Sequence, residues 1–194
     1  MRRNLAAGLL CALAAAVSGC GASGSSAVPA VVRAPPQSAR LGWEEPYPPT
    51  KPALVFGVTS FTVTRTGWFA QIWVENRSKV GWEVGGPRSA AARAFGVLLF
   101  PNDDLDELER RNRNGELPAI RDATRYDPVL PVVLQPGKTW RGTISAPGAL
   151  AGGLWLRISF GPFVSDNPPD GVLSPVVWFT DHAYHLAEWG VPQR

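Results

Sequence analysis

The histidines, which most often serve as catalytic bases and metal ligands, are confined to one short segment of this 194-residue sequence. His182 and His185 lie three residues apart and follow Asp181. On a strand, side chains three residues apart point to opposite faces, so these two would not converge on one ion. A helical turn would bring them together with Asp181 as a third ligand, whereas a structural metal site usually takes four. We therefore expect surface histidines and no metal.

Two groups of acidic residues have the chemistry of a calcium site but not its spacing. Residues 103–109 read as the start of a helix, and residues 166–171 as a turn without the alternating ligands and final glutamate of an EF-hand loop. The sequence has no Gly-x-Ser-x-Gly nucleophile motif and no phosphate-binding glycine loop. We expect no cofactor and no enzyme activity. Acids distant in the sequence can still pair in a cleft, and the Gly/Pro-rich loop 161–174 would be the place for a hydrolase site or an inhibitory loop.

The aromatic residues are more suggestive, because the sequence has 8 Trp, too many to fit easily into one core. Six of them fall in the predicted domain and the last in the tail that follows it: Trp68, Trp73, Trp82, Trp140, Trp155, Trp178 and Trp189. Aromatic side chains outside a core often mark surfaces that bind sugars, peptides or proteins. The candidate binding residues are Phe69, Trp73 and Trp155. The alternative is that the helix, a Pro-rich arm or the C-terminal tail covers Trp73 and Trp155.

Two consecutive runs of strand-forming residues would position Phe69 and Trp73. Residues 55–64 are rich in β-branched and aromatic side chains, and residues 68–76 follow after the short segment 65–67, which predicts a hairpin. In the second run, two sets of residues alternate: Trp68, Ala70, Ile72 and Val74 with Phe69, Gln71, Trp73 and Glu75. The first set predicts a buried face and the second a mixed, half-exposed face.

The remaining elements predict an all-β fold. Further strands are expected at residues 95–100, 129–134, 139–145, 154–160 and 175–180, separated by Gly-Pro turns. Residues 103–112 begin with acids and end with bases, which indicates one short surface helix. Short strands with regular turns and little helix favour an antiparallel β-sandwich.

Several strand ends and one turn resemble those of the immunoglobulin-like domains of bacterial surface lipoproteins. The residues concerned are Val74-Glu75-Asn76-Arg77-Ser78, then Leu134-Gln135-Pro136-Gly137 before Trp140-Arg141-Gly142-Thr143-Ile144, and Leu156-Arg157-Ile158. The resemblance covers residues 53–181 and implies an immunoglobulin-like sandwich. The Cys-Trp-Cys pattern of antibody domains is missing. Such a fold does not by itself assign a function.

The N-terminus has the composition of an export signal. A basic start, Arg2 and Arg3, precedes an apolar run over residues 5–17, shorter than the roughly 20 residues that span a membrane. The sequence Val17-Ser18-Gly19-Cys20 resembles the bacterial lipobox. The resemblance implies cleavage before Cys20, a lipid on its sulfur, and an extracytoplasmic position on a bacterial cell membrane. The alternative is an ordinary signal peptide that contains a cysteine.

The composition changes again near residue 53. Residues 21–51 are rich first in Gly and Ser and then in Pro, which predicts a flexible and then a stiffer spacer. Alternatively, Trp43 and Tyr47 pack on the domain as an N-terminal arm. The expected organisation is a signal peptide 1–19, a lipidated linker 20–52, a β-sandwich 53–185 and a C-terminal tail 186–194.

The low net charge of the mature chain argues against nucleic acid as a partner. The formal net charge of +3 falls to about +1 when the signal leaves with its two arginines, and no stretch concentrates basic residues, so we do not expect nucleic acid. We expect a membrane-anchored, non-catalytic binding or scaffolding module that contacts an envelope protein or a wall polymer through an exposed aromatic strand face. A hydrolase or hydrolase inhibitor using loop 161–174 is the alternative. A purely structural envelope component is a third possibility.

Overall fold

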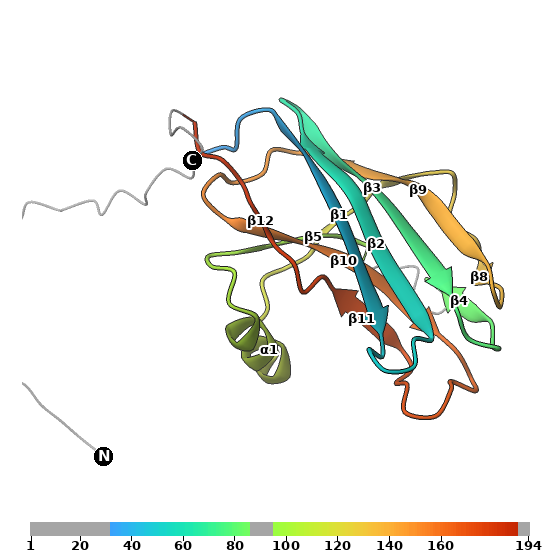
Figure 1. Cartoon of the computed structure of the whole chain (residues 1–194). Coiled ribbons are helices and arrows are strands. Elements are labelled where there is room, and N and C mark those ends of the chain that lie inside the picture. Colours follow the sequence, from blue (N-terminus) through green and yellow to red (C-terminus); the bar gives the residue numbers. More distant parts are fainter. Residues whose placement is uncertain (1–31, 86–94, 190–194) are drawn as a thin grey trace, which may run out of the picture. The chain divides into compact units, whose positions relative to one another are not determined.

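The computed structural model describes residues 32–85 and 95–189. These residues form two antiparallel sheets and one short helix, so the predicted all-β fold is confirmed (Figure 1). Buried side chains from both sheets form one continuous core between them, as in a sandwich. The predicted signal peptide, Cys20 and the linker residues before Val32 lie outside the described residues. Within the described part of the chain, no helix is long and apolar enough to cross a membrane.

The first sheet has five strands in the order β1-β2-β3-β9-β7. Their bounds are β1 (Gln37–Tyr47), β2 (Leu54–Val63), β3 (Gly67–Asn76), β9 (Thr139–Pro147) and β7 (Arg125–Asp127). The predicted hairpin is β2 with β3, in which Val63 lies opposite Trp68 and Leu54 opposite Asn76. Every second residue of β3 from Trp68 onward is buried, so the two predicted faces of this strand are confirmed.

The second sheet is built around β10 (Trp155–Val164), whose residues are almost all buried. Its other strands are β4 (Trp82–Val84), β5 (Gly96–Phe100), β6 (Arg121–Asp122), β8 (Val133–Leu134), β11 (Val176–Phe179) and β12 (Tyr184–His185). Four of them, β4, β5, β11 and β12, pair directly with β10. A strand with neighbours along its length has its backbone hydrogen bonds satisfied, so it can be apolar throughout.

Phenylalanines join the two sheets. Phe56 of β2 packs against Phe160 and Phe163 of β10, with 5.1 and 5.6 Å between ring centroids. Phe95 meets Phe163 edge to face at 5.7 Å. All four side chains are buried. Removing each ring from water contributes about 2–3 kcal/mol, so this cluster fixes the sheets and the strands that carry surface residues.

The predicted helix is present as α1 (Leu105–Asn114). Asp104 caps its N-terminus by accepting a 3.1 Å hydrogen bond from the Glu107 backbone N–H. Gly115 ends it in the left-handed conformation, with a φ of 70° that favours glycine. Leu108 packs the helix onto Leu98 and Phe100 of β5.

The predicted linker 20–52 is wrong over residues 37–47, because these form β1, which pairs with β2 along its length. The alternative, that Trp43 and Tyr47 pack on the domain, is confirmed: both side chains lie against the core. Prolines obscured the strand in the sequence. Pro46 is tolerated because β1 lies at the edge of its sheet, where not every backbone N–H needs a partner.

The predicted domain end at residue 185 is also too early. Leu186 is fully buried, and its backbone N–H donates a 2.9 Å hydrogen bond to the Leu154 carbonyl. The backbone of Val32 to Ala34 is likewise bonded to residues 150–152. The folded unit therefore includes residues on both sides of the predicted limits 53–185.

Candidate functional site

The outer side of the five-stranded sheet, which faces away from the second sheet, carries half-buried aromatic side chains and polar side chains in rows. The rows follow from the strand register, which aligns Thr62, Phe69 and Ser145 across β2, β3 and β9. The next two rows place Ser60, Gln71 and Thr143 side by side, and then Gly57, Trp73 and Arg141. We call these nine residues the aromatic face.

The indole ring of Trp73 packs directly on the backbone of a glycine in the neighbouring strand. A Cβ atom added to Gly57 would lie 2.0 Å from Cε2 and 2.2 Å from Nε1 of the Trp73 indole, so the ring occupies the space above that backbone. The Arg141 guanidinium stands over the same ring, with 5.0 Å between Cζ and the ring centroid. Trp73 is thus half-buried by its own sheet and still reachable from solvent. Glycine is uncommon within a strand and often marks such a close approach.

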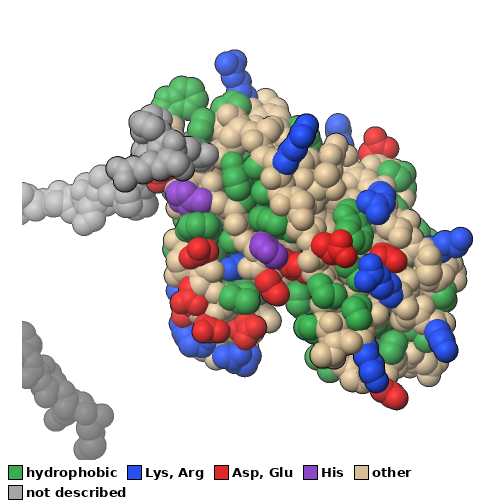
Figure 2. Space-filling view, in the orientation of Figure 1, with side chains coloured by type: hydrophobic (Ala, Val, Ile, Leu, Met, Phe, Trp, Pro, Cys, Tyr) green, Lys and Arg blue, Asp and Glu red, His purple; other side chains and the backbone are tan. Residues whose placement is uncertain are grey.

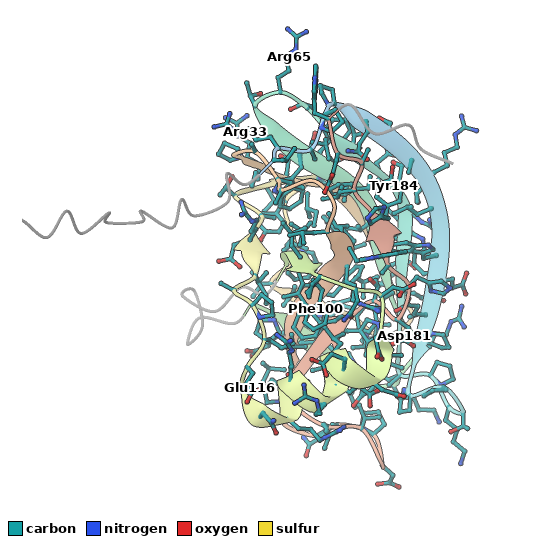
Figure 3. All side chains as sticks on the ribbon, turned by 90° about the vertical axis from the view of Figure 1, so that its left-hand side faces the viewer. Arg33, Arg65, Phe100, Glu116, Asp181 and Tyr184 are labelled. Carbon is teal, nitrogen blue, oxygen red and sulfur yellow. The ribbon has the colours of Figure 1, made fainter. Side chains whose placement is uncertain are left out.

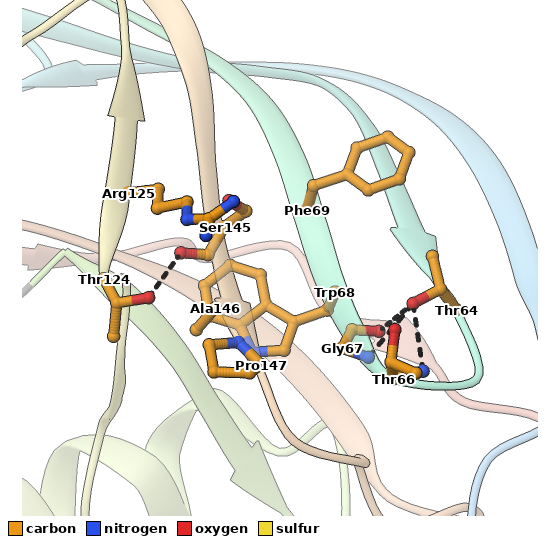
Figure 4. Close-up of a pocket in the computed structure, with 10 residues that line it drawn as sticks. All are labelled: Thr64, Thr66, Gly67, Trp68, Phe69, Thr124, Arg125, Ser145, Ala146 and Pro147. Carbon is orange, nitrogen blue, oxygen red and sulfur yellow. Dashed lines mark hydrogen bonds between the residues drawn. The ribbon is translucent and has the colours of Figure 1, made fainter.

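Phe69 lies at the other end of the face, beside a pocket of about 370 Å³ (Figure 4). Arg125 and Ser145 line the pocket on one side and the β2–β3 turn lines it on the other. Thr64 holds this turn: its hydroxyl accepts hydrogen bonds from the backbone N–H groups of Thr66 and Gly67 at 3.3 and 3.0 Å. The pocket therefore has a polar wall on either side of an aromatic ring.

Hydrogen-bonding groups and positive charge surround the two rings. The Ser60 hydroxyl donates a 3.1 Å hydrogen bond to Oε1 of Gln71. The NH₂ group of Gln71 takes no part in this bond and can donate to a ligand. Arg40 and Arg125 are exposed at the margins and form no ion pair among the described residues. Asp127 is an exposed acid near this margin. Figure 2 shows basic side chains spread over the side of the molecule that β1, β2, β3 and β9 form.

The structure brings Phe69 and Trp73 together but separates Trp155 from them, so the three predicted binding residues do not form one face. Trp155 belongs to β10 of the second sheet, where its ring meets that of His185 at 4.9 Å. Trp155 is half-buried, and the sequence could not show which sheet its strand joins. Trp155 is therefore removed from the candidate site.

A second polar group, which sequence reasoning missed, joins the two sheets at Glu45. Its carboxylate is buried and accepts hydrogen bonds from Trp178 Nε1 at 2.7 Å and from the backbone N–H groups of Asp181 and His182 at 2.9 and 3.1 Å. The His182 ring nitrogen Nδ1 lies 2.8 Å from the same carboxylate, and Trp43 stacks on that ring. We call these residues the Glu45 cluster.

A fully buried arginine lies next to the Glu45 cluster. The guanidinium of Arg157 donates to the backbone carbonyls of Thr180, Asp181 and Asp103, which ties β10 to the segment before α1. Burial lowers the pKa of Arg157, and the charges of Asp181 and Glu45 oppose that change. Burial raises the pKa of Asp181, and the Glu45 carboxylate raises it further. Figure 3 places Asp181 close to α1.

The arrangement of the Glu45 cluster suits holding the sheets together better than binding a ligand. Both carboxylate oxygens of Glu45 already accept hydrogen bonds from the protein. A period-two alternation over residues 37–47, with Trp43, Glu45 and Tyr47 on one side, was the available signal. Among the described residues, no group of three or more His, Cys, Asp or Glu side chains could hold a metal ion.

Loop 161–174, the predicted place for a hydrolase or inhibitor site, is shorter than expected, because residues 161–164 belong to β10. Ser174 closes the remaining loop by hydrogen bonds of 2.9 Å to the backbone N–H and carbonyl of Ser165. Beside it lies a pocket of about 290 Å³, and Asp166 of the loop and Glu83 of β4 both line that pocket.

Comparison with known proteins adds no assignment: no family model, curated protein or solved structure matches the chain. The lipobox and the relation to immunoglobulin-like lipoprotein domains stay predictions.

Proposed function

We propose that this chain is a bacterial envelope lipoprotein whose folded domain is a non-catalytic binding module for a wall polymer, with the aromatic face as its binding surface. The observation that carries the proposal is the seating of Trp73 over Gly57, on the same open face as Phe69. Two aromatic rings that stay partly open to solvent on one strand face, instead of joining the core, are typical of a binding surface.

The chemistry of the aromatic face favours a glycan. Aromatic rings can pack against the apolar side of a sugar ring, while hydroxyl and amide groups replace the water around sugar hydroxyls. Ser60, Thr143 and Gln71 supply such groups between the two rings. Phe69 and Trp73 are four residues apart on β3, which corresponds to about 14 Å along the strand. An extended polymer spans that distance, whereas a single sugar does not.

The charge of the aromatic face favours a polymer with acidic groups. Arg40, Arg125 and Arg141 are exposed on or beside the face and have no carboxylate partner among the described residues. The acids Glu44 and Glu75, by contrast, lie near Arg77, with N–O distances of 3.8 and 2.9 Å. Unpaired guanidinium groups recognise carboxylates and phosphates well.

Anchoring is the second part of the proposal, and it is supported by the Val17-Ser18-Gly19-Cys20 sequence. A lipid on Cys20 would keep the module at the membrane, where two or more acyl chains give stable attachment. The test is fractionation of cells that express the native chain or Cys20→Ser. We expect the native chain in the membrane fraction and the variant in the soluble envelope fraction. An identical distribution would refute the anchor.

The binding part is tested with insoluble bacterial cell wall as the probe. The mature chain carrying Cys20→Ser is mixed with the wall and sedimented, alone and with Phe69→Ala plus Trp73→Ala. We expect the double variant to lose at least 1.4 kcal/mol of binding, about tenfold in affinity. Trp155→Ala is the matched control and should bind as the parent does. Equal loss in both variants, or no binding by the parent, would contradict the proposal.

A hydrolase is the second candidate, because Glu83 and Asp166 line one pocket. Paired carboxylates in a groove can cleave glycosidic bonds, one as acid and the other as base or nucleophile. The assay is release of reducing sugar from the same wall preparation. Activity lost in both Glu83→Gln and Asp166→Asn would favour this candidate, and a parent protein that releases no sugar would exclude it for this polymer.

A further inference from the structure

A different surface lies at the end of the domain where the described chain begins. Residues 32–36, the β2–β3 turn and Trp189 enclose a pocket of about 350 Å³. The start of the chain is fixed there, because the Gly152 N–H donates to the Val32 carbonyl at 2.8 Å and the Ala34 N–H donates to the Leu150 carbonyl at 2.9 Å. We call the pocket residues Val32, Arg33, Arg65, Ala149 and Trp189 the tether end.

The tether end is positively charged. Arg33 and Arg65 both line its pocket and are exposed, and neither forms an ion pair or side-chain hydrogen bond among the described residues. Figure 3 shows both guanidinium groups at the same end of the domain. Arg121 adds a third charge nearby by donating a 3.2 Å hydrogen bond to the Ala149 carbonyl. Glu188, the acid that precedes Trp189 in the sequence, has its carboxylate packed against Gly153.

The same surface exposes apolar side chains. Trp189 is 73% exposed and Val32 is 47% exposed, and both line the same pocket as Arg33 and Arg65. Tryptophan is enriched at membrane–water interfaces, where its ring sits among lipid headgroups. Arginines beside such a ring are placed to meet lipid phosphates.

The length of chain before the tether end keeps it close to a membrane. From Cys20 to Val32 the sequence advances by only twelve residues, which reach at most about 40 Å when fully extended. This step rests on the anchoring part of the proposed function. With the lipid on Cys20, the nearest part of the folded domain to the membrane along the chain is the end that carries Arg33, Arg65 and Trp189.

We infer that the tether end docks on an anionic membrane surface, with Arg33 and Arg65 at the headgroup phosphates and Trp189 and Val32 in the interfacial layer. Docking supplements the lipid and orients the domain, so that the strands of the first sheet lead away from the membrane. The opposite end, with the β1–β2 turn and Lys51, then points toward the wall.

The test uses the mature chain carrying Cys20→Ser, so that no lipid contributes, and sedimentation with two kinds of vesicles. One kind is pure phosphatidylcholine and the other contains 30% phosphatidylglycerol. We expect binding to the anionic vesicles only, and a roughly 30-fold weaker partition for Arg33→Gln plus Arg65→Gln. Trp189→Ala should weaken partition as well, and the tryptophan fluorescence of the parent should shift to the blue on binding by more than that of Trp189→Ala.

A matched control removes two charges from the other end. Lys51 and Lys79 are exposed in the turns after β1 and β3, and Lys51→Gln plus Lys79→Gln should bind the anionic vesicles as the parent does. Equal losses in the two double variants, or equal binding to both kinds of vesicles, would overturn the inference. Phe69→Ala plus Trp73→Ala should leave vesicle binding unchanged, which separates this result from failure of the aromatic face.

Discussion

The Glu45 carboxylate on β1 accepts a 2.7 Å hydrogen bond from the indole N–H of Trp178 on β11, so a buried acid links the first strand of one sheet to a strand of the other. The two residues are 133 positions apart in the sequence. Burying a carboxylate is costly unless hydrogen bonds replace its water. The donors around Glu45 meet that requirement, and they fix β1 as part of the sandwich.

Replacing Glu45 should therefore destabilise the protein strongly. Glu45→Ala leaves the Trp178 N–H and two partly buried backbone N–H groups without their acceptor, and we expect a loss of about 3 kcal/mol in the free energy of unfolding. The neighbouring Glu44 points to the opposite, exposed side of β1. Glu44→Ala should cost less than about 0.5 kcal/mol. Chemical denaturation measures both, and similar losses would contradict the role assigned to Glu45.

Asp181 should make stability depend on pH. Its pKa is raised in the folded state by burial and by the Glu45 carboxylate, with Arg157 opposing. The folded protein then holds the proton more tightly than the unfolded chain, so this group lowers the free energy of unfolding as pH rises through its folded pKa. Asp181→Asn removes the effect. Relative to the native chain, the variant should gain stability between acid and neutral pH, as followed by urea denaturation at several pH values.

A stability difference between native chain and Asp181→Asn that stays constant across that pH range would show that Asp181 does not titrate with a raised pKa. Asp170→Asn in the loop after β10 is a suitable control, because that side chain is exposed and forms no ion pair among the described residues.

The seating of Trp73 over Gly57 can be tested by a double-mutant cycle. Gly57→Ala places a methyl group within 2.0 Å of the indole and must displace the ring, so it should destabilise the native chain by about 1–3 kcal/mol. In a Trp73→Ala background the same change should be neutral or stabilising, because glycine weakens a strand. Additive effects of the two substitutions would indicate that the ring does not lie over Gly57.

The sequence predicted best those elements whose side chains alternate over a long run. β3 shows the period-two pattern from Trp68 to Asn76, which placed Phe69 and Trp73 on one face correctly. The helix was predicted by its charge order, and the structure moves its first residue from 103 to Leu105. The predicted strand 129–134 is reduced to Val133–Leu134, and Val129 and Val132 before it are exposed.

What the sequence could not predict depends on contacts between distant residues. Strands of two or three residues, such as β6, β7 and β12, are too short to show any period. The acid at Glu45 looked like part of a Pro-rich spacer, because its partners Trp178 and His182 lie at the other end of the chain. The position of Trp155 in the second sheet likewise depends on the pairing of β10 with β5 and β12, which the residues next to Trp155 in the sequence do not reveal.

The most direct test of the account is photocrosslinking in cells from position 71, in the middle of the aromatic face. A photoreactive amino acid replaces Gln71 in the anchored chain, and position 106, an exposed position of α1, serves as the control site. We predict a crosslink from position 71 to material that resists protease and is released by a wall-degrading glycosidase. A crosslink to a protein, or equal yields from the two positions, would contradict the aromatic face as a glycan-binding surface.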